Sequence, residues 1–192
     1  MKPILFNTEM VRAILEGRKT VTRRVVKLPK RVQKQENGLY TLFTEGTVYE
    51  NFCIEQIVDY ISPYQVGDIL YVRETWIPKE SEENGKLVKG FAYKADFTGY
   101  ESMFAWRPSI HMPKEAARIF LRVTDVRVER LQDITDEQAE AEGFNDYTST
   151  ALGFPVTWDN TIKPDQFERY GWHANPYVWV IEFERVEKPA AD

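Results

Sequence analysis

The sequence predicts an α+β fold, a small and strongly bent β-barrel with helices packed at its openings. Two long runs predict the strands, since residues 117–131 and 177–184 alternate apolar and polar side chains. Two segments with clear start and stop signals, residues 8–16 and 135–142, predict the helices. With 192 residues the chain is long enough for one sizeable core. We therefore expect a single domain over residues 1–192.

The first predicted helix ends at Gly17, where a left-handed backbone costs least. Asn7 or Thr8 can cap its start. Its apolar residues recur at helical spacing, namely Met10, Val11, Ile14 and Leu15. The β-favouring residues 20–26 follow and predict a strand. Lys19 therefore lies on the turn or at the beginning of the strand, and Thr22 and Arg24 point to the same side of it.

Residues 27–64 are poorly periodic, and we interpret them as an insertion or elaborated loop with a hairpin turn at Asn37-Gly38 and a helix around residues 48–60.

A strand is expected over residues 69–76, with Leu70, Val72, Glu74 and Trp76 on one face. Arg73 and Glu74 fit an exposed barrel rim. Alternatively, Arg73 or Trp76 lines the mouth of a pocket, the arginine fixing phosphate and the tryptophan stacking on a base. Pro78 should end the strand, and residues 80–89 should form a polar loop.

Residues 106–113 contain two prolines that hold the backbone in an extended or turn conformation. This segment can present Trp106, Arg107 and His111. A lone histidine is more often a structural hydrogen-bonding group, so His111 is expected at the rim of a pocket. Ser109 lacks the pattern around a hydrolase nucleophile.

The run of residues 117–131 is interrupted at Thr124-Asp125, which predicts a bulge or bend. Thr135 and Gln138 form a capping box, and the helix that they start should run to Glu142 before Gly143. At the negative end of the helix dipole, Glu142 is either an exposed surface carboxylate or, if shielded, one with a slightly raised pKa. Residues 145–175 look irregular apart from a helix near residues 164–170. The last strand should have one core face and one partly wet face.

The net charge of −5 conceals a basic segment. Residues 18–34 hold eight Lys or Arg and no acid, so the rest of the chain carries −5 − 8 = −13. Such a segment either contacts phosphate or is a solvated strand and loop, and the low pI argues against broad coating of duplex DNA.

Composition excludes several classes of protein. One cysteine, Cys53, excludes an internal disulfide framework and suits a reducing compartment. No run approaches the roughly 20 apolar residues of a membrane span, and residues 1–6 are too short for a signal peptide. We therefore expect a cytoplasmic protein with no membrane partner. With two histidines and one cysteine, a zinc site is improbable, and we expect no metal and no cofactor.

The spacing Gly17-x-Lys19-x-x-Thr22-x-Arg24 resembles the G-x-K-x-x-T-x-R signature of the ASCH domain family, in the PUA-like superfamily. Three further segments are similar to that family: residues 67–72 to its turn and central strand, 135–144 to its second helix, and 175–186 to its closing strand. The segments RETW and RPSIHMP are more like those of the larger ASCH proteins of phages and prophages. Relative to the minimal family, insertions are expected near residues 27–64, 77–105 and 145–175.

Small bacterial ASCH proteins are amidohydrolases that remove the acetyl group of N4-acetylcytidine with a lysine, a threonine and a glutamate. The resemblance implies that Lys19, Thr22 and Glu142 are catalytic and that Arg24 is the motif arginine. Either Thr22 attacks the carbonyl while Lys19 takes its proton and Glu142 serves the leaving amine, or Glu142 activates a water and Lys19 stabilises the oxyanion.

Further substrate-binding candidates are Arg23, Arg73, Trp76, Trp106, Arg107 and His111. The expected partner is a modified nucleoside or single-stranded RNA. Two alternatives remain. The chain is an RNA- or nucleotide-binding module without turnover, with Trp76, Trp106 or Tyr100 stacking on bases. Otherwise it is a ribonuclease, in which Lys19 or His111 assists a 2′-hydroxyl.

Overall fold

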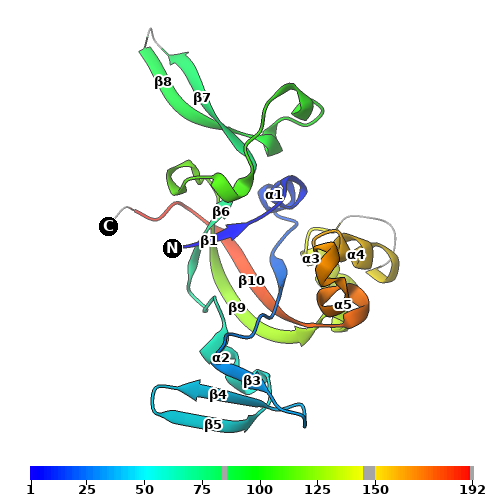
Figure 1. The fold of residues 1–192 in the computed structure, drawn as a ribbon. Helices are drawn as coiled ribbons and strands as arrows, with labels where there is room; N and C mark the ends of the chain where they lie inside the picture. The colour runs from blue at the N-terminus through cyan, green and yellow to red at the C-terminus, as the bar shows by residue number, and fades with distance from the viewer. Residues whose placement is uncertain (84–85, 145–149, 191–192) are drawn as a thin grey trace.

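The computed structural model describes residues 1–83, 86–144 and 150–190, and it confirms the α+β class (Figure 1). Its main sheet has the strand order β1-β6-β9-β10-β2. These strands are β1 Lys2–Leu5, β6 Ile69–Arg73, β9 Phe120–Arg130, β10 Tyr177–Val186 and β2 Val21–Val25. β1 runs parallel to β6, and the other neighbours are antiparallel. The predicted strands at residues 20–26, 69–76, 117–131 and 177–184 thus form this sheet, whereas β1 was not foreseen.

The main sheet is open, so the expected closed barrel is not supported. Among the described residues β1 and β2 each pair with one neighbour only and are therefore the edges. The side chain of Arg24 bridges these edges instead of a backbone ladder, donating from Nη2 to the Leu5 carbonyl at 2.9 Å. β9 and β10 bend strongly (Figure 1). Glu182 of β10 pairs with Asp125 of β9, and the next residue, Phe183, pairs with Val123. Thr124 is therefore left without a partner in β10 and is the extra residue of the predicted bulge.

Apolar side chains fill both faces of the sheet. One face carries a large cluster that includes Ile4, Leu70 and Ile181. On the other face, Val178 and Val180 of β10 pack against residues of the C-terminal helices. This face of β10 becomes wet only beyond Val180, so the prediction of a partly wet face is confirmed.

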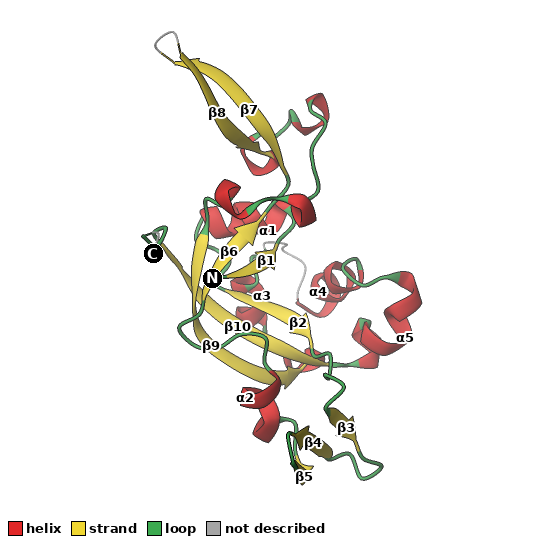
Figure 2. Cartoon of the chain, turned by 60° about the vertical axis from the view of Figure 1, so that its left-hand side comes forward, coloured by secondary structure: helices red, strands yellow, loops and turns green. Residues whose placement is uncertain are grey.

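The helices expected over residues 8–16 and 135–142 begin and end close to where the sequence indicated. Asn7 caps α1, with its side chain accepting from the Met10 N–H at 2.9 Å, and Gly17 follows with φ +77°. The capping box of Thr135 and Gln138 is formed at α3, and Gly143 follows with φ +85°. The α-helices are α1 Thr8–Leu15, α2 Val58–Ile61, α3 Asp136–Ala141, α4 Thr150–Asp159 and α5 Phe167–Tyr170. Figure 2 shows α4 and α5 gathered beside β2 and the end of β9.

Short 3-10 helices join these elements. They are η1 Glu55–Ile57, η2 Lys94–Asp96, η3 Glu101–Met103, η4 Ser109–His111, η5 Lys114–Ala116, η6 Leu131–Asp133, η7 Pro164–Gln166 and η8 Trp172–Ala174. The helix expected near residues 164–170 is η7 with α5. The expectation of an irregular chain after residue 144 is wrong for α4, which contains Pro155 and has no single apolar face to reveal it. Residues 145–149 lie outside the described residues.

A second sheet occupies part of the first expected insertion. It has the order β3-β4-β5, with β3 Val32–Lys34, β4 Tyr40–Thr44 and β5 Thr47–Phe52. The turn at Asn37-Gly38 joins β3 to β4 as predicted. The helix expected over residues 48–60 is wrong in its first part, because Val48 and Tyr49 pair with β4 and helical structure begins only at Glu55. Val32, Tyr40 and Leu42 belong to the same apolar cluster as the main sheet.

A two-stranded hairpin projects from the main sheet (Figure 1). It consists of β7 Trp76–Glu83 and β8 Lys86–Tyr93, so the polar loop expected over residues 80–89 is wrong. Pro78 does not end the strand but lies in β7 opposite Phe91. A two-stranded ribbon has two free edges, where a proline costs no ladder hydrogen bond. Residues 84–85 lie outside the described residues. None of the helices that the structure describes is long and apolar enough to cross a membrane.

Candidate functional site

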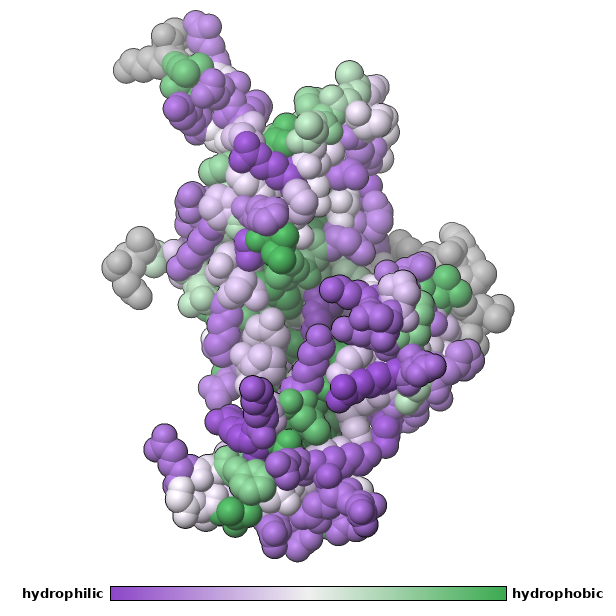
Figure 3. Space-filling view, viewed as in Figure 1, coloured by the Kyte–Doolittle hydropathy of each residue, from purple (hydrophilic) through white to green (hydrophobic). Residues whose placement is uncertain are grey.

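A cleft with a volume of about 640 Å³ opens beside the edge strand β2. Its walls are Asn7, Glu9 and Met10 at the start of α1, residues 142–144 at the end of α3, and residues of α4 and the turn after it. Arg18, Arg23 and Arg24 also line it. Figure 3 shows this face of the molecule hollowed beside the C-terminal helices, with mostly hydrophilic residues around the hollow. This volume is typical of a small-molecule site.

Backbone contacts bring the end of α3 to the beginning of β2. The N–H groups of Arg18 and Lys19 both bind the Ala13 carbonyl, which closes α1 and turns the chain at Gly17. The Thr20 N–H then binds the Ala141 carbonyl at 2.8 Å, and Lys19 forms an isolated β-bridge with Glu142. Glu142 is thus fixed next to the motif lysine, although the two are 123 residues apart in sequence.

Lys19 is a buried ammonium group with three acceptors. Its Nζ donates to the Val21 carbonyl at 2.8 Å, to the Glu142 carbonyl at 2.9 Å and to Glu142 Oε2 at 2.6 Å. The residue is only 2% exposed, and this burial lowers the pKa of Lys19, an effect that the nearby Glu142 carboxylate opposes. Three acceptors match the three protons of an ammonium, so the geometry describes a charged lysine that holds Glu142.

Arg23 links both ends of α3. Its Nη2 donates to Gln138 Oε1 at 2.7 Å and to Glu129 Oε2 at 3.2 Å, and its Nη1 lies 3.5 Å from Glu142 Oε1. Gln138 Oε1 also accepts from the Thr135 N–H at 3.2 Å. The glutamine that caps the helix therefore also orients an arginine of the cleft.

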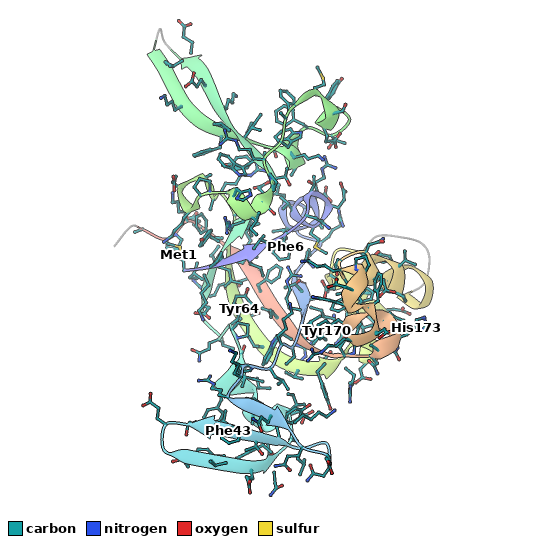
Figure 4. All side chains as sticks on the ribbon, in the orientation of Figure 1. Met1, Phe6, Phe43, Tyr64, Tyr170 and His173 are labelled. Atoms are coloured by element: carbon teal, nitrogen blue, oxygen red, sulfur yellow. The ribbon has the colours of Figure 1, made fainter. Side chains whose placement is uncertain are left out.

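Arg24 is held by backbone carbonyl groups. Its Nη1 donates to the Arg23 carbonyl at 3.1 Å and its Nη2 to the Leu5 carbonyl at 2.9 Å. The guanidinium also lies 5.2 Å from the ring centre of Phe6, which follows β1 (Figure 4). Burial lowers the pKa of Arg24. The side chain is thus fixed at the cleft by groups that carry no full charge.

Thr22 does not reach the cleft. It is 0% exposed, lies in β2 opposite Ile181, and is absent from the lining residues. Its Oγ1 is buried without a hydrogen-bond partner among the described residues. The structure therefore brings Arg23, Arg24 and Glu142 together at the cleft, whereas Lys19 is buried behind Glu142 and Thr22 is buried in the sheet, both outside the lining residues.

The structure does not bring Arg73 and Trp76 to the cleft. Arg73 donates from Nε to the Met112 carbonyl at 3.0 Å and also binds the Ile110 carbonyl. Trp76, at the start of β7, is only 5% exposed and packs in a third apolar cluster, so it has no face for a base to stack on.

Trp106, Arg107 and His111 also lie outside the cleft lining. Trp106 donates from Nε1 to the Glu101 carbonyl at 2.6 Å and packs with Phe97 and Phe104. Arg107 lies 5.3 Å from the ring centre of Trp76, and His111 is exposed in η4. His173 lies at the outer side of the C-terminal helices (Figure 4).

Several cleft residues were missed from the sequence. Gln138 was identified as a capping residue, but nothing in the sequence indicated that it reaches Arg23. The wall formed by Thr157, Trp158 and Asn160 was missed with α4 itself. Arg18 was noted only as part of the basic segment.

Comparisons with known proteins give little similarity. No family model matches the chain. No curated protein is similar to it. One solved structure, a protein from Enterococcus faecalis V583 described as family DUF984, is similar over 100% of this chain and 85% of its own, with 12% identity and a TM-score of 0.47. Similarity at this level says nothing about the activity of the chain.

Proposed function

We propose that the chain is an ASCH-type, PUA-like domain that acts on cytidine-type nucleosides or RNA. Most concretely, it hydrolyses the acetyl amide of N4-acetylcytidine to cytidine and acetate. The observation that carries the proposal is the buried Lys19–Glu142 pair at a nucleoside-sized cleft, with Nζ and Oε2 2.6 Å apart. The motif lysine and the helix-terminal glutamate are therefore in contact, which supports this chemistry.

The geometry favours water as the nucleophile over Thr22. Glu142 lines the cleft, whereas the Thr22 hydroxyl is buried and Lys19 has no free lone pair while its three protons are bound. In this route Glu142 takes a proton from a water that attacks the acetyl carbon. The C–N bond then breaks, Glu142 returns the proton to the cytosine amine, and acetic acid leaves and loses its proton to solvent as acetate. Lys19 orients Glu142, and Arg23 supplies positive charge for the developing oxyanion.

The test is release of cytidine from N4-acetylcytidine by the purified protein. Glu142→Gln should abolish release, whereas Glu140→Gln, which changes an exposed glutamate on the same helix, should leave it unchanged. No turnover by folded wild-type protein would overturn the proposal.

Thr22→Val separates the two routes. Activity retained in this variant supports the attack by water. Activity lost in Thr22→Val and retained in Thr22→Ser would assign the nucleophile to the threonine, and would require that the hydroxyl become uncovered when substrate binds.

A second candidate, an RNA-binding module without turnover, is favoured by the exposed basic segment. Lys27, Lys30 and Lys34 are all exposed to solvent. Phosphate contacts of this kind make affinity fall steeply with salt concentration. A salt titration with single-stranded RNA therefore separates this candidate from a nucleoside hydrolase. The ribonuclease alternative has less support, because His111 lies outside the cleft and Lys19 is fully engaged.

A further inference from the structure

The charged side chains that line the cleft are paired, with one exception among the described residues. Glu9 accepts from Arg12 at 2.7 Å, and Arg18 pairs with Glu16 at 2.5 Å. Glu142 and Arg23 belong to the network with Lys19 and Glu129 described above. Arg24 alone makes no ion pair and contacts only the carbonyl oxygens of Arg23 and Leu5.

An arginine in this position is suited to an oxyanion. Its planar guanidinium has five N–H donors, and the two carbonyl contacts leave donors that can receive two oxygens of one phosphate. The Arg24 side chain is part-buried and forms no ion pair, so a ligand anion would supply the charged partner that it lacks in direct contact. Burial lowers the pKa of Arg24, and the Glu142 carboxylate nearby opposes this effect.

The start of α1 forms the adjacent wall of the cleft. Asn7 and Met10 line it, and the N-terminus of a helix attracts anions through its free N–H groups and its dipole. The opposite wall has Thr157, Asn160 and Thr161, whose hydroxyl and amide groups can bind the edge of a base. The cleft of about 640 Å³ thus has Arg24 at one end and a neutral polar side, and its two carboxylates, Glu9 and Glu142, are already paired with Arg12 and Lys19.

We propose that the preferred ligand of this cleft is a phosphorylated cytidine, a nucleoside monophosphate whose phosphate binds Arg24 and which therefore binds more tightly than the free nucleoside. The cytidine part rests on the proposed function, whereas the phosphate part rests on Arg24 and the walls beside it.

Calorimetric titration of the whole chain with cytidine, cytidine 5′-monophosphate, cytidine 3′-monophosphate and inorganic phosphate tests it. Wild-type protein should bind one of the monophosphates about 10-fold to 100-fold more tightly than cytidine, because charged hydrogen bonds are gained. Arg24→Gln should lose this preference. Arg122→Gln, which removes the same charge at an exposed position of β9, should retain it.

Four results would overturn the proposal: equal affinity for cytidine and both monophosphates, no binding of either monophosphate at millimolar concentration, inorganic phosphate binding as tightly as the nucleotides, or an unchanged preference in Arg24→Gln. If Arg24→Gln does not fold, Arg24→Lys replaces it in the test. This variant keeps the charge but loses the paired N–H donors of the guanidinium, so it should reduce the preference for a monophosphate. If neither variant folds, the wild-type comparison alone decides. Preference for a monophosphate without hydrolysis of N4-acetylcytidine would overturn the proposed function and leave the phosphate site. Hydrolysis of N4-acetylcytidine without preference for a monophosphate would support the proposed function and overturn the phosphate site.

Discussion

Lys19 and Glu142 form an ion pair whose side chains are 0% and 8% exposed. Removing the lysine leaves a carboxylate that is nearly buried and has lost its closest partner. Lys19→Met should therefore lower the free energy of unfolding by about 3–5 kcal/mol, measured by urea denaturation. The double variant Lys19→Met/Glu142→Gln should recover part of that loss. A loss below about 1 kcal/mol in the single variant would show that the pair is not formed as described.

Glu74 is a second buried carboxylate, 1% exposed, which accepts from Arg118 Nε at 2.9 Å. Burial raises the pKa of Glu74 above its ordinary 4.5, so between 4.5 and the raised value the folded protein binds more protons than the unfolded chain. Stability from this group is fully present below pH 4.5 and falls as the pH rises through the raised pKa. The unfolding free energy of the wild type should thus fall relative to Glu74→Gln as the pH increases through this window.

Thermal or urea unfolding at a series of pH values measures this difference. Glu80→Gln, at an exposed position of β7, serves as the control and should follow the wild type throughout. A difference between wild type and Glu74→Gln that grows in favour of the wild type with rising pH would contradict the assignment.

At the scale of single residues, the sequence allows a prediction where a short motif or a helix signal marks the position. Lys19 and Arg24 were singled out because they lie in one short motif that resembles a family signature, and Glu142 because its segment resembles the second helix of the same family. Glu74 was placed on the correct face, but its partner was not, because Arg118 is 44 residues away in sequence. The burial of Thr22 also depends on neighbours that only the tertiary structure supplies.

Gly143 connects two elements, the end of α3 and the packed side of α1. Its φ is +85°, and an added Cβ would lie 2.7 Å from Ala13 Cβ and 3.1 Å from Lys19 Cβ. Gly143→Ala should therefore cost about 2–4 kcal/mol of stability, from backbone strain and overpacking together.

Gly46 provides a matched control for this prediction. Its φ is +80°, but a Cβ there meets nothing within 4 Å, so Gly46→Ala should cost only the backbone strain of about 1–2 kcal/mol. The free energy of unfolding of both variants is measured by urea denaturation. Equal losses of this free energy would mean that α1 and α3 move apart to accommodate the added methyl group and that they are not closely packed.

At the scale of elements, caps and periodicity predicted most of what the structure contains. α1, α3 and the bulge at Thr124 followed from local signals. β1 is only four residues long and α4 contains Pro155 without a periodic apolar face, so neither had such a signal. The hairpin of β7 and β8 was hidden because Pro78 and a polar sequence are usual in loops, yet a free edge tolerates both.

The whole molecule consists of the main sheet with its helices and two peripheral sheets. In the hairpin, Lys79 pairs with Gly90, and Leu87 beyond this pair is 66% exposed. Joining residues 79 and 90 through an Asn-Gly turn should therefore change the unfolding free energy by no more than about 0.5 kcal/mol.

The base of the hairpin should behave differently. Trp76 is buried, so Trp76→Ala should cost about 3–5 kcal/mol in the same denaturation assay. A shortened hairpin that destabilises the chain as much as Trp76→Ala would show that the outer part of the hairpin contributes to the core.

The sequence distance between Lys19 and Glu142 also concerns how the chain is made. The two residues are 123 positions apart, and the strand that pairs with β2, β10, is the last strand of the chain. Until these parts of the chain have been synthesised, residues 17–24 have neither the carboxylate of Glu142 nor the neighbouring strand β10. Loop closure of this length is slow compared with local helix formation, so α1 can form early and the cleft only after β10 has paired with β2. Occupancy of the cleft by a ligand would therefore report that β10 has been synthesised and has joined the sheet.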